Sequence, residues 1–189
     1  MARIAAFCLV GLFIVAERAL RRDQAALSIE ATPDDHGTTR LIGAAYGVAL
    51  SLGILAPRLS RLEPRTVRLS RLSRAGLLLM VGGIALRVWA AITLGRFYTR
   101  TLRTSAGQTV VRAGPYAAIR HPGYLADLIM WLGFGLCSES WLAIASICSA
   151  MGFAYTRRID AEEKMLRANL GEAYETYSMN TARLVPRVY

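Results

Sequence analysis

The sequence is poor in the residue types on which disulfide-bonded and metal-binding proteins depend. It has three cysteines and two histidines in 189 residues. The cysteines form no CxxC pair, and each lies in an apolar stretch, where a thiol behaves as a small hydrophobic group. We therefore expect no disulfide framework and no metal site.

A dinucleotide-binding fingerprint is also missing. The string GFGLCS at 133–138 begins like one, but it lacks the third glycine and lies in an apolar stretch. No DNA- or RNA-binding motif accompanies the formal net charge of +10. We therefore expect no Rossmann domain and no nucleic-acid partner, and we interpret the arginines as flanking membrane spans.

Long apolar stretches are what the sequence has in excess. Hydrophobic residues make up 54% of the chain, and its mean hydropathy is +0.34. A membrane-spanning helix needs about 20 mostly apolar residues. We predict an all-α integral membrane protein with about five transmembrane helices, a helical cytoplasmic C-terminal tail and no Rossmann domain. The five candidate spans are 2–20, 41–57, 75–95, 123–137 and 141–156.

Basic residues near the span ends predict the orientation. With five spans, the 21–40 loop, the 96–122 loop and the C-terminal tail share one side, which holds most of the basic residues. We predict a multi-pass membrane protein with this side, including the catalytic loops, in the cytoplasm. Six arginines between 58 and 74 lie on the other side and interleave with leucines, which indicates a segment on the membrane surface.

Charged residues within the spans are expensive and point to function or pairing. Glu17 and Arg18 end the first span, and we expect both to reach the lipid headgroups. Arg87 lies near the centre of the third span, where a buried ion pair and a contact with a substrate anion fit equally well. Asp127 is expected to pair with an arginine, with ligand contact as the alternative.

Glycines in two spans predict close helix packing. Gly43 and Gly47 form a GxxxG pattern in the second span, and Gly82 and Gly83 lie in the third. Small residues of this kind let helix backbones approach each other in lipid.

A stiff polar segment, VRAGPYAAIRHPGY at 111–124, interrupts the apolar pattern. Pro122 disfavours a helical conformation at His121 and suits the first position of a helix. We therefore predict that His121 lies at a helix cap and that the fourth span begins at Pro122. The free N–H groups and the dipole at such a helix start suit a carboxylate or phosphate. The candidate binding residues here are Tyr116, Arg120, His121 and Tyr124.

The segment 157–189 is predicted to continue the fifth span out of the membrane as a helix. Arg158 and Glu162 are four residues apart and share a face, and Glu163 and Arg167 share the neighbouring face. Glu162 and Glu163 are about 100° apart around a helix. At most one of them therefore contacts a ligand directly, and the other orients an arginine.

Gly171 is expected to end this helix, and Tyr174 and Tyr177 share a face of the next one. Taken alone, the segment is also typical of a solvated cytoplasmic tail with ordinary ion pairs. Together with the RHP segment it favours a binding site.

The combined motifs GPYxxxRHPxY, RxxxEExxLxxxxGxxYxxY and a final RLVP resemble the isoprenylcysteine carboxyl methyltransferase family, part of a broader group that includes phospholipid methyltransferases. The resemblance covers about residues 93–187, and the first 92 residues match only in having spans. We therefore divide a single domain into N-terminal transmembrane helices at 1–92 and a catalytic region at 93–189. Leu170–Gly171 departs from the Phe-Gly usual in the family.

The resemblance implies S-adenosylmethionine as the cofactor, bound between the last spans and the tail. It implies that Arg158 and Glu163 lie beside the reacting groups, as catalytic residues. The methyl acceptor would be lipophilic and lipid-borne: an isoprenylcysteine carboxylate or another carboxylate, phenol or amine. The expected cofactor-binding residues are Tyr116, Arg120, His121, Tyr124, Glu162, Tyr174 and Tyr177.

Two alternatives to a methyltransferase remain at this stage. Sterol reductases that use NADPH share a distantly similar C-terminal region, although their chains are much longer. A small non-enzymatic membrane protein explains the apolar stretches but leaves the RHP and EE motifs without a role.

Overall fold

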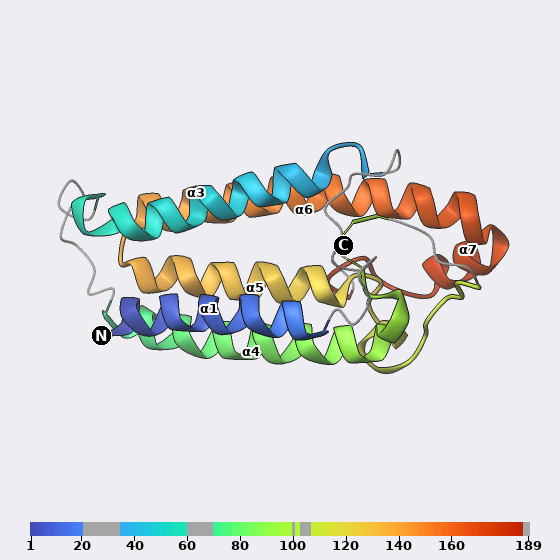
Figure 1. The fold of residues 1–189 in the computed structure, drawn as a ribbon, viewed down its shortest axis with the longest axis horizontal. Helices are drawn as coiled ribbons and strands as arrows, with labels where there is room; N and C mark the ends of the chain where they lie inside the picture. Colours follow the sequence, from blue (N-terminus) through green and yellow to red (C-terminus); the bar gives the residue numbers. More distant parts are fainter. Residues whose placement is uncertain (21–34, 60–69, 100, 103–106, 187–189) are drawn as a thin grey trace.

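The computed structural model describes residues 1–20, 35–59, 70–99, 101–102 and 107–186. Within these residues the chain is helical and contains no strand. The long helices run alternately up and down a bundle, and the N-terminus lies at the end opposite α7 (Figure 1). They are α1 (Ala2–Leu20), α3 (Thr38–Leu59), α4 (Ser70–Leu94), α5 (Pro122–Ser138) and α6 (Trp141–Leu170).

The shorter elements gather at one end of the bundle. This end holds the 3-10 turns η2 (Gly95–Phe97) and η3 (Gly114–Ala117) and the helix α7 (Glu172–Met179) (Figure 1). It is also where α5 begins and α6 ends, so the two polar motifs meet there. The sequence predicts that the connections now found at this end share one side of the membrane.

All five predicted spans coincide with helices, which confirms the all-helical architecture. Among the described residues, two segments, Thr38–Ala56 and Leu72–Phe97, are long and apolar enough on their own to cross a membrane. The number of five spans therefore stays a prediction. The arginine-rich segment between 58 and 74 lies largely outside the described residues.

Local chemistry explains where α5 and α6 begin. His121 is the N-cap of α5 and Pro122 is its first residue, as predicted from the RHP motif. Glu139 ends α5 in a left-handed conformation with φ of 57°. Ser140 then caps α6 by accepting a hydrogen bond from the backbone N–H of Ala143 at 3.2 Å. This short connection makes α5 and α6 a tight antiparallel hairpin.

Glycines bring α4 and α5 into close contact, the most extensive helix contact in the described chain. A Cβ atom on Gly83 would lie 2.7 Å from the carbonyl oxygen of Ala126. Gly82 has open space around its Cβ position. The expected packing role of Gly43 and Gly47 is wrong, because no described atom of another helix lies within 4 Å of either Cβ position. A GxxxG pattern marks a possible contact, but no neighbouring helix uses this one.

We expect Gly83→Ala to destabilise the protein and Gly82→Ala to leave it as stable or more stable. Both changes raise helix propensity by up to about 1 kcal/mol. Only the first forces a methyl group against the backbone of α5, which costs about 1–3 kcal/mol. Thermal unfolding in a mild detergent measures the difference between the two variants. Equal midpoints would contradict the role assigned to Gly83.

Candidate active site

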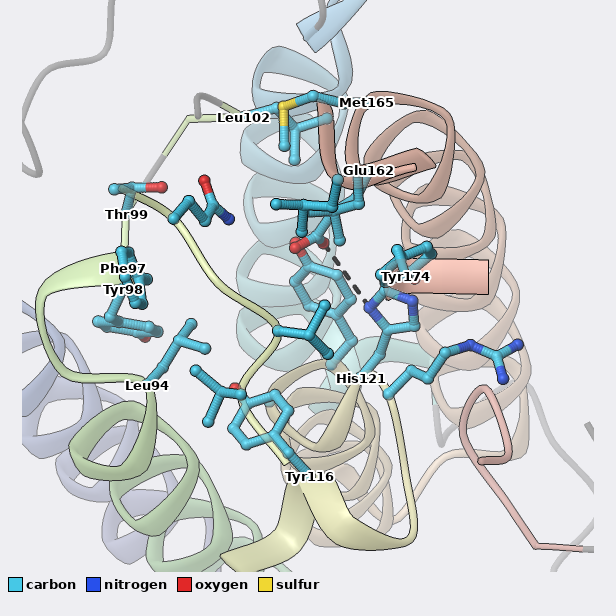
Figure 2. A pocket seen from close by; sticks show the side chains of 18 of the residues that line it. Leu94, Phe97, Tyr98, Thr99, Leu102, Tyr116, His121, Glu162, Met165 and Tyr174 are labelled. Carbon is cyan, nitrogen blue, oxygen red and sulfur yellow. Dashed lines mark ion pairs between the residues drawn. The ribbon is translucent and has the colours of Figure 1, made fainter. Parts of the chain in front are cut away.

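A cavity of about 120 Å³ lies at the end of the bundle where α7 and the 95–121 connection gather (Figure 2). Figure 2 shows His121 and Glu162 joined by an ion pair on one side of it, with Phe97 and Tyr98 on the opposite side. The structure brings every predicted site residue except Glu163 to the lining. Those residues are Tyr116, Arg120, His121, Tyr124, Arg158, Glu162, Tyr174 and Tyr177.

His121 is buried between two carboxylates. Its Nδ1 lies 3.7 Å from Glu162 Oε2, and its Nε2 lies 3.3 Å from Glu163 Oε1. The imidazole stacks on the ring of Tyr124, with centroids 5.6 Å apart and planes 10° apart. The cap position of His121 and these contacts hold the ring in one orientation at the start of α5.

Three tyrosines form a wall of hydrogen-bond donors. Burial raises the pKa of Tyr116 and Tyr174 above the usual value, and it raises the pKa of Tyr177 to about 12. All three phenols therefore stay protonated at neutral pH. Tyr177 uses its O–H group to hold the backbone carbonyl of Tyr116 at 2.7 Å, which ties α7 to η3.

Two polar atoms in the lining have no hydrogen-bond partner within the described part of the chain. They are Oε2 of Glu162 and the hydroxyl oxygen of Tyr174, whose side chain is 3% exposed. Buried polar groups in native proteins are nearly always paired, so unpaired ones indicate a missing partner. The cavity therefore presents one anionic acceptor and one phenol to a polar ligand.

A second cavity, of about 340 Å³, lies beside the first between α1, α3 and the centre of the bundle. Its walls include the apolar side chains of Phe13, Ile14 and Ile42. Ile14 is 52% exposed, so this wall reaches the outer surface of the bundle. The two cavities share the residues Arg87, Thr99, Tyr124 and Arg158.

Arg158 is held at this junction from two sides. Its NH1 group donates to Asp35 Oδ1 at 2.5 Å and to the hydroxyl of Thr38 at 2.9 Å. Its Nε donates to the hydroxyl of Tyr124 at 3.1 Å. The predicted partner Glu162 lies one turn further along α6 and faces His121. The guanidinium is 4% exposed.

Arg87 is the centre of a buried ion cluster next to the junction. Its Nε lies 2.8 Å from Glu17 Oε1, and its NH1 lies 3.3 Å from Asp127 Oδ2. The pairing of Asp127 with an arginine is confirmed, and Arg87 forms the buried ion pairs that were one of its two expected roles. The expectation that Glu17 reaches the headgroups is wrong: its residue is 7% exposed, and its carboxylate turns inward to Arg87 and Tyr98.

A comparison of the sequence with known families matches part of the chain to an enzyme family. Residues 76–168 match the model of the isoprenylcysteine carboxyl methyltransferase (ICMT) family. The matched residues make up just under half of the chain, and over them the chain is similar to this family. The resemblance drawn from the RHP and EE motifs is confirmed, and the chain is an integral membrane methyltransferase.

Relatives of this methyltransferase include plant and bacterial proteins. A probable protein-S-isoprenylcysteine O-methyltransferase from Oryza sativa subsp. indica is 28% identical over 152 residues, 79% of this chain and 80% of the relative. The cobalt-zinc-cadmium resistance protein CzcN of Cupriavidus metallidurans is 32% identical over 102 residues, 54% of this chain and 43% of the relative.

A solved structure shares the fold of this methyltransferase. The eukaryotic intramembrane Ras methyltransferase ICMT matches with a TM-score of 0.69 and 22% sequence identity. The match covers 100% of this chain and 68% of the other. At this level of identity the likeness shows a common intramembrane helical fold.

Glu163 of this methyltransferase lies behind the cavity, as the centre of a second ion cluster. Its residue is 1% exposed. Its Oε1 accepts from Arg120 Nε at 2.9 Å, and its Oε2 accepts from Arg183 at 2.9 Å and from Arg167 at 3.3 Å. Burial raises the pKa of Glu163, but hydrogen bonds and charge from His121 and Arg120 outweigh burial and lower it to about 2. The contacts match the orienting role expected for one of the two glutamates.

The C-terminal segment is tied to the RHP motif by main-chain hydrogen bonds. Ile119 and Ala182 form an isolated parallel bridge. Arg120 N–H donates to the carbonyl of Ala182 at 2.8 Å, and His121 N–H donates to the carbonyl of Arg183 at 3.1 Å. The tail thus positions the loop that presents His121. This contact explains why the RLVP part of the motif accompanies the RHP part.

Several lining residues carried no signal that the sequence reasoning could use. Most are apolar residues at the end of α4 and in the connection that follows, where they resemble the rest of a span. Asp35 precedes α3 in the string DDHGTT, which signals only a helix start. The lining residues missed in this way include Leu94, Phe97, Tyr98, Thr99, Leu102 and Met165.

Proposed function

We propose that the protein transfers a methyl group from S-adenosylmethionine to the carboxylate of a prenylated cysteine. The junction of the two cavities at Arg158 carries this proposal, because it places a polar ligand site against an apolar one. The name of the relative from Oryza sativa, a probable protein-S-isoprenylcysteine O-methyltransferase, supports the choice of acceptor. The similarity to the ICMT family and to the methyltransferase from Oryza sativa favours this function over an NADPH-using reductase or a non-enzymatic membrane protein.

The residues of the first cavity fit S-adenosylmethionine. Oε2 of Glu162, which accepts no hydrogen bond from the described residues, suits an ammonium group, and Arg120 and the phenol of Tyr174 suit a carboxylate. The rings of Tyr116 and Tyr124 suit a sulfonium. When bound, the cofactor supplies an activated methyl group. The side chains position it and exclude water, which are the main contributions that such a transfer needs.

The second cavity and Arg158 fit a lipid-borne carboxylate. A guanidinium donates charge-assisted hydrogen bonds to a carboxylate in a fixed direction, which a freely rotating ammonium group does not match. The apolar side chains of Phe13, Ile14 and Ile42 suit a prenyl chain that enters between α1 and α3. A carboxylate acceptor needs no general base, so we now assign Glu163 to positioning Arg120 and His121 and keep Arg158 as the catalytic residue.

We further propose that all five long helices cross the bilayer and that the end carrying the cavity faces the cytoplasm. The excess of basic residues on the connections at this end supports the orientation. Within one domain, residues 1–92 would form the N-terminal transmembrane helices and residues 93–189 the catalytic region. Contacts cross this division, because Asp35 pairs with Arg158 and Glu17 accepts a hydrogen bond from Tyr98.

We expect Glu162→Gln to weaken S-adenosylmethionine binding about ten- to hundredfold, because one charge-assisted hydrogen bond contributes roughly 1.5–3 kcal/mol. Isothermal titration calorimetry of the detergent-solubilised protein measures the dissociation constant. Glu172→Gln is the matched control, since Glu172 is exposed on α7, and it should bind normally. Equal affinity in both variants would place the cofactor elsewhere.

Methyl transfer itself is tested with radiolabelled S-adenosylmethionine and N-acetyl-S-farnesylcysteine in lipid nanodiscs. We expect a labelled methyl ester that is released as methanol by base. Labelling of a phenol or amine from extracted lipid, with no label in the cysteine derivative, would overturn the choice of acceptor.

A further inference from the structure

A fully buried carboxylate from the N-terminal half of the chain lies against Arg158. Asp35 is 0% exposed, and its Oδ1 accepts from Arg158 NH1 at 2.5 Å. It lies three residues before the start of α3 and outside residues 76–168, the part that matches the family model. Asp35 therefore contacts the proposed catalytic arginine but does not belong to the family motifs.

The first turn of α3 holds Asp35 in place. Its Oδ2 accepts from the backbone N–H of Thr39 at 3.1 Å, and its Oδ1 accepts from the Thr39 hydroxyl at 2.7 Å. The hydroxyls of Thr38 and Thr39 also accept from Arg158 NH1, at 2.9 and 3.1 Å. Burial raises the pKa of Asp35, but hydrogen bonds from Thr39 and the Arg158 guanidinium outweigh burial and lower it below its usual value. Asp35 is thus a fixed anion.

The contacts on Arg158 define the plane of its guanidinium. Three acceptors at the start of α3 hold NH1, and the hydroxyl of Tyr124 on α5 holds Nε at 3.1 Å. A guanidinium is a rigid planar fork, so two anchored nitrogens determine its direction. Without such anchors, this long side chain would sample several rotamers, and it would hold the acceptor less accurately.

We propose that Asp35 is a positioning residue that aims Arg158 at the junction of the two cavities, so that the N-terminal helices help to build the catalytic site. The proposal rests on the proposed function, because Arg158 must act on the acceptor for its direction to matter. A purely structural ion pair between α3 and α6 is the competing explanation. The two helices also pack along their length and are joined by a hydrogen bond between the hydroxyls of Tyr46 and Tyr155, 2.9 Å apart.

The kinetic test compares Asp35→Asn with the wild type, with radiolabelled S-adenosylmethionine and N-acetyl-S-farnesylcysteine in nanodiscs. We expect kcat/KM for the acceptor to fall about tenfold or more, while the Kd of S-adenosylmethionine changes less than about twofold. Asp35→Glu restores part of the lost rate, since it keeps the charge. Glu139→Gln is the control: it removes a carboxylate that holds Ser73 at the opposite end of the bundle, and it should leave both values unchanged.

A double variant of Asp35 and Arg158 distinguishes a positioning role of Asp35 from a purely structural one. If Asp35 acts through Arg158, the double variant Asp35→Asn/Arg158→Lys is no slower than Arg158→Lys alone. Additive losses, or a tenfold loss in cofactor affinity with Asp35→Asn, would show a structural role and overturn the proposal. Should Asp35→Asn fail to accumulate, the same comparison is made with Asp35→Glu.

A final measurement does not depend on turnover. Phenylglyoxal modifies accessible arginines, and mass spectrometry measures the modified fraction at Arg158. We expect the rate of modification to rise at least about threefold in Asp35→Asn, because the guanidinium loses its anchor. An unchanged rate overturns the proposal even if the enzyme methylates a different acceptor. A raised rate in a protein that does not methylate the cysteine derivative supports Asp35 and rejects the proposed acceptor.

Discussion

Glu163→Gln should unfold the site of this methyltransferase and lower its overall stability. The change keeps the shape of the side chain but removes the buried charge that Arg120, Arg183 and Arg167 share behind the cavity. Breaking a buried ion pair by removing one partner costs about 3–5 kcal/mol. Because Arg120 and His121 both contact Glu163, we also expect binding of S-adenosylmethionine to fall by more than a hundredfold.

Thermal unfolding and calorimetry measure both effects. The control is Glu175→Gln, which removes an exposed carboxylate on α7 and should change stability by less than about 0.5 kcal/mol. Arg167→Gln should also have a small effect, because Arg167 is 46% exposed in its pair with Glu163. A Glu163→Gln protein that is as stable as the control would show that the cluster is dispensable.

The same cluster predicts the acid limit of the enzyme. The pKa of Glu163 is about 2 in the folded state and about 4.5 in a free side chain. A lowered pKa stabilises the folded state above the higher value, and the effect is lost as pH falls through the lower one. The contribution, about 3 kcal/mol at about 1.4 kcal/mol per pKa unit, should therefore be complete above pH 4.5 and gone near pH 2. Glu163→Gln should remove this part of the pH dependence.

Arg87→Leu should cause the second large loss of stability. It removes the guanidinium that lies between the carboxylates of Glu17 and Asp127 in the centre of the bundle. Two buried carboxylates close together then lack their common cation, and we expect a loss of about 3–5 kcal/mol. Unfolding by denaturant in detergent micelles measures it.

Two further variants test the cause of that loss. Arg74→Leu, at an exposed position of the same helix, should change stability by less than about 0.5 kcal/mol. Combining Arg87→Leu with Glu17→Gln and Asp127→Asn removes the uncompensated charges and should recover most of the loss. If the triple variant is no more stable than Arg87→Leu, the space that Arg87 fills matters more than its charge.

The parts of the fold that depend on local chemistry were predictable from the sequence. Apolar runs long enough for a membrane predict the five helices, and Pro122 predicts the start of α5 with His121 as its cap. The site residues of the RHP and EE motifs followed from their spacing and from the family resemblance. Gly171 ends α6, as its conformational freedom predicts.

The parts that depend on distant contacts were not predictable. Helical periodicity separates the faces of Glu162 and Glu163, but it does not say which face meets the cavity. Glu17 and Arg87 are separated by about 70 residues of sequence, and nothing in either span indicates that they pair. Asp35 lies in a short polar string whose local pattern shows a helix start and no partner on α6.

The two cavities approach the junction at Arg158 from different sides of the molecule. One lies beneath α7 at the end of the bundle, and the other lies between α1 and α3. Under the proposed function, we expect a ligand in either cavity to leave the other cavity accessible. The ternary complex then forms in random order. An unreactive analogue of either substrate is expected to compete with that substrate and to inhibit non-competitively toward the other.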